Sequence, residues 1–140
     1  MRSGYLLLET SASHPGLVRV FIAAALPPLP GPAADPALRQ AVRCADIDLV
    51  RMHAHELLRR RLVDIDVGLY RAGPLEAVAA VESIDLDHRR VYLDPVLAND
   101  PGLGPAIAAL IARRQRHDRV WEWVGMAALG LLLIKLLLDI

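Results

Sequence analysis

Apolar residues come in two short runs near the start of the chain, at residues 4–9 and 17–24, and each run is bounded by polar or turn-forming residues. Runs of this length, rich in aliphatic, β-branched and aromatic side chains, are typical of β-strands. The segment between them contains Pro15-Gly16, a dipeptide that favours turns. The pattern predicts an N-terminal β-hairpin over residues 1–26.

Prolines dominate the next segment, residues 27–36, which begins with Pro27-Pro28-Leu29-Pro30. A proline-rich segment stays extended and semi-rigid, so we interpret this one as a connector, with a recognition role as the alternative. Asp35 and Pro36 are residue types preferred at the first positions of a helix. We therefore expect a helix to begin at Pro36.

The apolar residues that follow have a helical spacing. Five of them recur at intervals of four, three, four and three residues: Leu38, Val42, Ala45, Leu49 and Met52. This spacing places them along one side of an α-helix. The run Arg59-Arg60-Arg61 complements the negative end of a helix dipole. The spacing predicts a long amphipathic helix from Pro36 to about Val63.

The segment from Val63 to Asp94 has the pattern of a strand, a helix and a second strand. Apolar and polar residues alternate over 63–70, a short helix is expected over 74–83, and residues 90–94 are the last strand candidate. This order is typical of a βαβ unit with a right-handed crossover. We expect the helix and this unit, residues 37–100, to form a small α/β domain with the hairpin, and an α+β fold is the alternative.

The most apolar stretch of the chain runs from Trp121 to Leu138, and the twelve residues from Trp123 to Ile134 carry no charge. At about 1.5 Å per residue, residues 120–140 make a helix of roughly 30 Å, the thickness of the hydrocarbon core of a bilayer. The remaining residues form too small a body to bury such a helix on every side. The stretch predicts one C-terminal transmembrane helix over 120–140, with a buried core helix as the alternative.

No proline or glycine interrupts the chain between Pro105 and Trp121. The juxtamembrane helix expected over residues 103–119 should therefore continue into the transmembrane helix as one rod of about 50 Å. A continuous rod would hold the soluble domain in a fixed position relative to the membrane. Such stiffness suits a subunit that docks on a membrane partner.

Residues at the two ends of the apolar stretch predict its orientation. Four arginines precede it and a single lysine lies near its far end, so the positive-inside rule places the N-terminal domain in the cytoplasm. Tryptophan and lysine side chains near helix ends prefer the headgroup level. The residues expected at the membrane interface are Arg113, Arg114, Arg116, Arg119, Trp121, Trp123 and Lys135. The small residues expected to permit close packing of a second helix are Gly125, Ala128 and Gly130.

Composition argues against several classes of function. The chain has 16 basic and 16 acidic residues and only 4% aromatic residues, so it lacks the basic face and the stacking surface of nucleic-acid-binding proteins. Its early apolar runs do not fit a signal peptide, and export is the alternative. The single cysteine, Cys44, is compatible with a reducing compartment. We interpret it as a small buried apolar residue, with a reactive thiol as the alternative.

Candidate metal ligands are few. His53 and His55 are two residues apart, and on a helix this spacing points them about 200° away from each other, so they cannot share one metal ion. Aspartates recur in closely spaced pairs, and the last pair is followed by a histidine. Carboxylates suit hard cations such as Mg²⁺, so the candidates for a cation site are Asp85, Asp87 and His88. Solvated acids at helix starts and strand edges are the alternative.

The sequence contains no phosphate-binding glycine loop and no Gly-x-Ser-x-Gly motif. We expect no cofactor and no nucleic-acid partner. The leading hypothesis is a non-catalytic accessory or assembly subunit of a larger complex in the bacterial inner membrane, in contact with lipid and with other membrane-protein subunits. One rival is a membrane effector or sensor whose domain binds a ligand and whose helix oligomerises. The other is a small metal-dependent enzyme that uses Asp85, Asp87 and His88.

Overall fold

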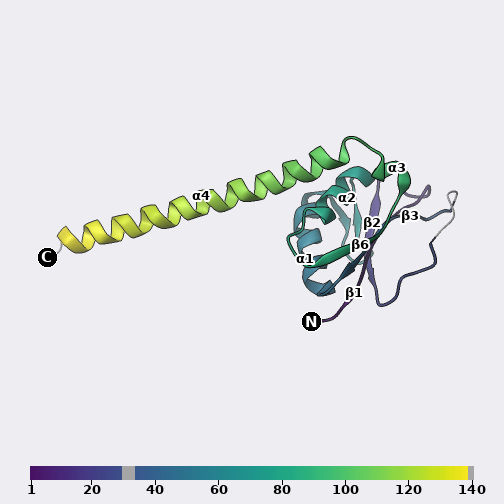
Figure 1. The fold of residues 1–140 in the computed structure, drawn as a ribbon, viewed down its shortest axis with the longest axis horizontal. Coiled ribbons are helices and arrows are strands. Elements are labelled where there is room, and N and C mark those ends of the chain that lie inside the picture. Colours follow the sequence, from purple (N-terminus) through teal and green to yellow (C-terminus); the bar gives the residue numbers. More distant parts are fainter. Residues whose placement is uncertain (30–33, 139–140) are drawn as a thin grey trace.

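The computed structural model describes residues 1–29 and 34–138 and contains one six-stranded sheet with helices on one face and a long helix that leaves the body (Figure 1). Neighbouring strands are antiparallel throughout, in the order β4-β5-β2-β1-β3-β6. The fold is therefore α+β. The elements are β1 (Gly4–Thr10), β2 (Val18–Ala23), β3 (Ala37–Cys44), α1 (Ile47–Leu58), the 3₁₀ turn η1 (Arg59–Arg61), β4 (Leu62–Asp64), β5 (Leu69–Tyr70), α2 (Pro74–Glu82), β6 (His88–Leu93), α3 (Pro95–Ala98) and α4 (Leu103–Leu138).

The predicted hairpin is confirmed. Strands β1 and β2 pair antiparallel, with Leu7 opposite Phe21, and Gly16 in the turn between them has a φ of 74°. On its other side β1 pairs with β3, where Leu7 lies opposite Ala41. Strand β1 is therefore central, with partners on both edges.

The long helix predicted from Pro36 to about Val63 is confirmed only over Ile47–Leu58, and it is wrong at both ends, because η1 and β4 follow α1 from Arg59 onward. Residues Ala37–Cys44 form β3, and α1 begins only at Ile47, where the Asp46 side chain accepts a hydrogen bond from the Leu49 backbone N–H at 3.3 Å. The apolar spacing suggested a helix because β3 is buried on both faces, so its residues do not alternate cleanly. Pairing with two neighbouring strands decides the conformation of this segment.

The proline-rich connector carries no helix or strand in its described residues 27–29 and 34–36. Residues 30–33, the centre of that predicted segment, lie outside the described residues. Asp35 does not cap a helix but accepts a hydrogen bond from the Ala12 backbone N–H of the hairpin turn at 3.2 Å. Leu26 packs against the helix-free face of the sheet. Leu26, just before the connector, therefore contacts the sheet, and Asp35, near the connector's end, contacts the hairpin turn.

The predicted βαβ unit has the right order of elements but not a parallel pair. Four antiparallel pairings separate β5 from β6 in the sheet, so these two strands point in the same direction. Three strands lie between them, so β5 and β6 are not neighbours as the strands of a βαβ unit would be. The single strand expected over 63–70 is two short strands joined by a turn, because the Asp64 carboxylate accepts hydrogen bonds from the backbone N–H groups of Asp66 and Val67. Gly68, with a φ of 75°, completes that turn.

The main core lies between the sheet and helices α1 and α2. Its fully buried side chains come from alternate positions of the central strands and from the inner faces of the two helices: Leu6, Leu8, Val42, Cys44, Val50, Ala54, Val78 and Val81. A smaller cluster, Leu7, Leu38 and Ala41, is buried on the opposite face. The central strands are thus covered on both faces.

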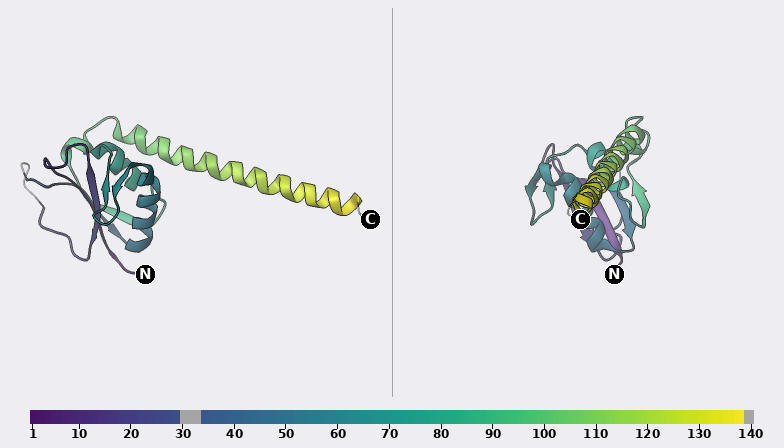
Figure 2. Two further views of the ribbon diagram at one scale, coloured as in Figure 1. Left: turned by 180° about the vertical axis from the view of Figure 1, so that it is seen from behind. Right: turned by 90° about the vertical axis from the view of Figure 1, so that its left-hand side faces the viewer.

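Helix α4 is continuous over 36 residues, as predicted, and only its first turns contact the body. Leu103 is buried, and Ala106, Ile107 and Leu110 pack against the core beside α2. The Arg114 guanidinium then donates to the Ser83 carbonyl oxygen at 2.9 Å and lies 3.9 Å from the Asp85 carboxylate. Beyond this point α4 projects away from the domain (Figures 1 and 2). The body therefore holds the base of the helix at a fixed angle.

We expect Gly68→Ala to destabilise the domain more than Gly16→Ala. Both glycines have positive φ, which costs a residue with a side chain about 1 kcal/mol. A Cβ on Gly16 would meet nothing within 4 Å, whereas one on Gly68 would lie 2.2 Å from the Val20 carbonyl oxygen. The backbone shift needed at Gly68 should bring its total cost to about 3 kcal/mol. Thermal unfolding of the two variants, followed by circular dichroism, measures the difference, and equal midpoints would contradict the proposed clash.

Arg114→Ala should lower the stability of the domain by about 1 kcal/mol, because it removes a charge-assisted hydrogen bond to the Ser83 carbonyl oxygen that is partly exposed to water. Arg113→Ala is the matched control, since Arg113 is an exposed neighbour on the same helix. The same unfolding measurement applies. A loss of stability as large for Arg113→Ala would show that helix propensity, not this contact, is responsible.

Candidate functional site

The outer part of α4 is a candidate membrane span. It is long and apolar enough to cross a membrane, and none of its most apolar window is buried inside the protein. From Val120 to Leu138 the helix measures about 27 Å, close to the thickness of a hydrocarbon core. A core helix of a soluble domain would instead be mostly buried. Asp139 and Ile140, the last residues of the predicted span, lie outside the described residues.

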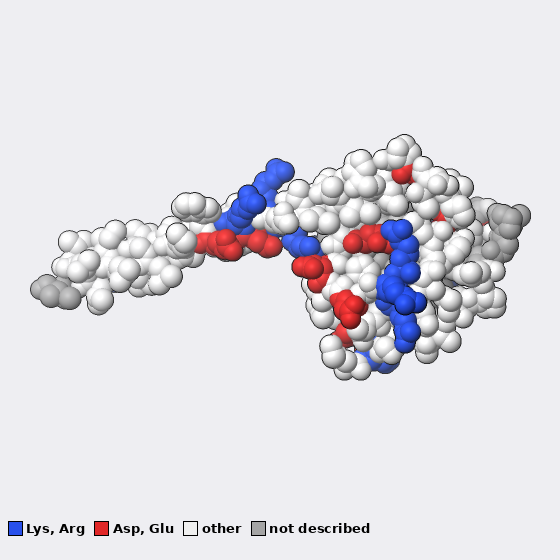
Figure 3. All heavy atoms as spheres, viewed as in Figure 1, with Lys and Arg blue, Asp and Glu red and all other residues white. Residues whose placement is uncertain are grey.

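The predicted interface residues lie along the middle and far end of α4. Arg113, Arg116 and Arg119 are exposed and, at three-residue intervals, follow one side of the helix. Arg114 instead turns back to the body. On the face shown in Figure 3, charged side chains gather on α4 next to the body, and the described surface beyond them is uncharged. The change from charged to apolar surface is therefore abrupt.

The aromatic and basic groups nearer the apolar end are also exposed. The Trp121 indole N–H donates to the His117 imidazole Nε2 one turn earlier at 3.1 Å. Trp123 and Lys135 project from the helix without a contact from the described part of the domain. These three predicted residues are thus free to reach lipid headgroups, because nothing in the described domain covers them.

The small residues of α4 do not share one side. At about 100° per residue, Gly125 and Ala128 lie about 60° apart, while Gly130 lies about 140° from Gly125. A Cβ added at Gly125 or at Gly130 would meet nothing within 4 Å. The side that carries Gly125 and Ala128 therefore presents the smoother surface to a second helix.

The candidate cation ligands are engaged elsewhere. Asp85 is exposed and faces Arg114, and the His88 imidazole Nδ1 lies 2.7 Å from the Leu86 carbonyl oxygen, to which it must donate a proton. In the described residues no group of three or more histidine, cysteine, aspartate or glutamate side chains is placed to hold a metal ion. The structure does not bring Asp85, Asp87 and His88 together as one ligand set.

Arginines also surround this region. A hollow of about 280 Å³ is lined by Asp87, His88, Ser3 and the directly opposed pair Arg43 and Arg89. Basic side chains form a column over this part of the body in Figure 3. Two guanidinium groups beside one carboxylate repel a cation. The hollow is therefore electrostatically unsuited to Mg²⁺.

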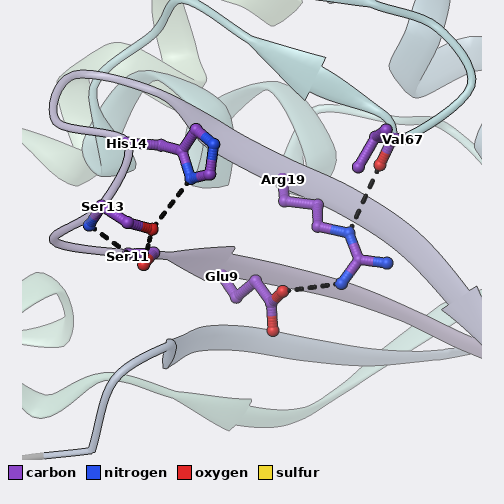
Figure 4. Close-up of polar contacts among 6 residues, drawn as sticks. All are labelled: Glu9, Ser11, Ser13, His14, Arg19 and Val67. Atoms are coloured by element: carbon purple, nitrogen blue, oxygen red, sulfur yellow. Dashed lines mark hydrogen bonds and ion pairs between the residues drawn. The ribbon is translucent and has the colours of Figure 1, made fainter.

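A serine and histidine cluster occupies the turn of the hairpin (Figure 4). The Ser13 hydroxyl lies 2.8 Å from the Ser11 hydroxyl and 3.0 Å from the His14 imidazole Nδ1. Ser13 and His14 are exposed, and within the described residues no carboxylate hydrogen-bonds to the imidazole. An imidazole without an orienting carboxylate is a poor general base for activating a serine hydroxyl. We therefore interpret the hydrogen bonds of Ser11, Ser13 and His14 as stabilising the turn.

A hollow of about 510 Å³ lies between α1, β2 and the turn over residues 65–68. We call it the α1 cavity. It is lined by Arg19, Val20, Phe21, Ile22, Asp48, Arg51, Met52, His55, Ile65, Asp66, Val67, Gly68 and Tyr70. Its lining comes from separate segments that only the fold brings together, so sequence reasoning missed it.

Two lining residues form a polar pair inside the α1 cavity. The His55 imidazole Nδ1 lies 2.9 Å from the hydroxyl of Tyr70, whose ring is buried. Burial raises the pKa of Tyr70 above its ordinary value, and the nearby Arg51 guanidinium partly offsets that rise. His53, two residues earlier on α1, is exposed and does not share this site.

Cys44 is fully buried at the end of β3. Burial raises the pKa of its thiol, and a hydrogen bond with the Leu6 backbone partly opposes the shift. Thiolate is the reactive form, so both the position and the pKa disfavour reaction at neutral pH. The residue acts as a small apolar member of the core.

The native chain should react with an uncharged aromatic disulfide reagent roughly a hundredfold more slowly than the denatured chain, because Cys44 is reached only when the sheet opens. The control is Ser13→Cys in a Cys44→Ala background, which places the only thiol on the exposed hairpin turn. The control should react at nearly the same rate in both states. Rapid reaction of native Cys44 would show that β3 opens readily.

No protein-family model, curated protein or solved structure matches this chain. Three structural features bear on function: the exposed apolar part of α4, the packing of its first turns on the domain, and the α1 cavity.

Proposed function

We propose that this chain is a single-pass, C-terminally anchored protein of the bacterial inner membrane that acts as a non-catalytic accessory or assembly subunit of a larger membrane complex. The observation that carries the proposal is the division of α4 into a base packed on the domain and an apolar remainder without an internal partner. Lipid and the helices of other subunits are the environments in which such a surface is stable.

The arginines of α4 support a cytoplasmic position for the domain. Arg113, Arg116 and Arg119 all lie on the domain side of the apolar stretch, and only Lys135 lies near its other end. Arginine and lysine near a membrane span are retained on the cytoplasmic side.

The distance between body and membrane supports a docking role. Among the described residues, Arg114 is the last on α4 with a hydrogen bond or an ion pair to the body, and Val120 begins the apolar stretch six residues later, which is about 9 Å along the helix. The domain is therefore held close to the headgroups by a helix without an internal break. A partner with a cytoplasmic face beside its own span would meet both the helix and the domain.

A second candidate function is a membrane-bound sensor or effector. The α1 cavity favours it, because its volume lies in the range of small-ligand sites and polar groups converge on one of its walls. In that role the ligand would bias how the domain and its helix associate with other copies. The two candidates differ in what accompanies the chain in the membrane.

Purification of the tagged full-length chain in a mild detergent, with native mass spectrometry of the product, tests the two candidates. An accessory subunit should carry other membrane proteins in a fixed ratio. A homo-oligomer recovered alone would overturn the accessory role and favour the sensor.

Two glycine variants make the test specific for the helix surface. Gly125→Leu should reduce recovery of the partners by roughly threefold or more, since it enlarges the side that also carries Ala128. Gly130→Leu adds the same volume on another side of the helix and serves as the matched control. If both variants retain the partners at the level of the unmodified chain, contact through this side of α4 is excluded.

A further inference from the structure

One of the two arginines that line the α1 cavity, Arg51, forms no ion pair in the described part of the chain, and one of its two aspartates, Asp66, also forms none. Arg19 at its edge pairs with Glu9 at 2.9 Å, and Asp48 pairs with Arg2 at 2.7 Å. An arginine whose charge is not matched inside the protein is a binding group for an anion.

Hydrogen-bonding groups stand beside this charge. Tyr70 is only 5% exposed, and its hydroxyl is held by the His55 imidazole at 2.9 Å. Arg51 lines the same cavity. Arg51, His55 and Tyr70 together offer a cation and two polar groups on one wall.

The rim of the cavity is apolar although it faces water. Met52 is 56% exposed on α1, and Ile65 and Val67 are 65% and 42% exposed on the turn across from it. Three aliphatic side chains from two segments thus surround one hollow. Covering them would be favourable at about 25 cal/mol for each Å² removed from water.

The position of the turn is determined by the backbone. The Val20 N–H donates to the Gly68 carbonyl oxygen at 2.8 Å, and Gly68 approaches the Val20 carbonyl so closely that a Cβ would lie 2.2 Å from its oxygen. The Asp64 carboxylate holds the other end of the turn through two backbone N–H groups. Internal hydrogen bonds therefore fix the conformation of the turn that carries Ile65 and Val67, and this conformation does not depend on a ligand.

The charges of the lining select among anions. Two arginines, Arg19 and Arg51, and two aspartates, Asp48 and Asp66, line the cavity, so its formal charge is zero. A polyanion such as a nucleotide would gain from Arg51 but would be repelled by the two carboxylates. A singly charged ligand avoids most of this repulsion.

We propose that the α1 cavity binds a small monocarboxylate with an apolar body. The carboxylate pairs with the Arg51 guanidinium next to the His55 and Tyr70 side chains, and the apolar body lies against Met52, Ile65 and Val67. This binding site is independent of the accessory role, because it uses none of the residues of α4. A result that excludes carboxylate binding in the α1 cavity therefore does not bear on the accessory role.

The experiment uses the full chain in lipid nanodiscs and phenylbutyrate as the probe, with its uncharged amide, phenylbutyramide, and the doubly charged phenyl phosphate for comparison. Binding is measured by isothermal titration and by saturation-transfer difference NMR, with empty nanodiscs subtracted. Phenylbutyrate should bind saturably, and each comparison compound should bind at least about tenfold more weakly, as expected for loss of a charge-assisted hydrogen bond or for added repulsion.

Three variants connect binding to the cavity. Arg51→Gln should weaken phenylbutyrate binding by about tenfold or more, whereas Arg60→Gln, at an exposed arginine outside the cavity, should leave it unchanged. Met52→Asp adds a negative charge to the exposed rim and should weaken the acid more than the amide. Circular dichroism of each variant establishes that the fold is retained.

Three outcomes would overturn the proposal. One is the absence of saturable phenylbutyrate binding. Another is equal affinity for the acid and the amide, which would mean that apolar contact alone is being measured. The third is an equal effect of Arg51→Gln and Arg60→Gln, which would place the acid at the general surface.

Discussion

Burial of β1 on both faces is the constraint on which the rest of the domain depends. Leu6 and Leu8 point into the main core, Leu7 points to the opposite face, and all three are almost fully buried. A slip of one residue against either neighbour would exchange the two faces, so this strand determines the register of β2 and β3. Strand β6 then adds to β3, and β5 adds to β2.

Most of the long helix α4 lies outside the small domain. The domain packs against the first turns of α4 through Leu103, Ile107 and Leu110. Arg114 closes this contact by bonding to the end of α2 at the Ser83 carbonyl. The described domain leaves the apolar remainder uncovered, and this remainder is long and apolar enough to cross a bilayer. The contacts of the first turns of α4 determine the direction in which this helix leaves the domain.

The α1 cavity arises where the sheet is least complete. Strand β5 pairs with β2 at only two residues, Val18 and Arg19, after which the chain turns away at Gly68. The outer edge of β2 beyond Val20 is left facing α1 across an open space. Arg51 and His55 reach into that space from α1 because they lie four residues apart on one helix face. The α1 cavity is therefore a consequence of the short length of β5.

The sequence alone determined the hairpin, the helix α2 and the continuous helix α4, because each depends on local turn residues or on a long uniform pattern. Only the tertiary structure decided that residues 37–44 form a strand, since their apolar spacing fits a helix equally well and pairing with β1 and β6 is a long-range choice. The tertiary structure also decided that three strands lie between β5 and β6, and it brought together the segments that line the α1 cavity. A site built from segments distant in sequence leaves no periodic signal, because its residues meet only after the sheet has formed.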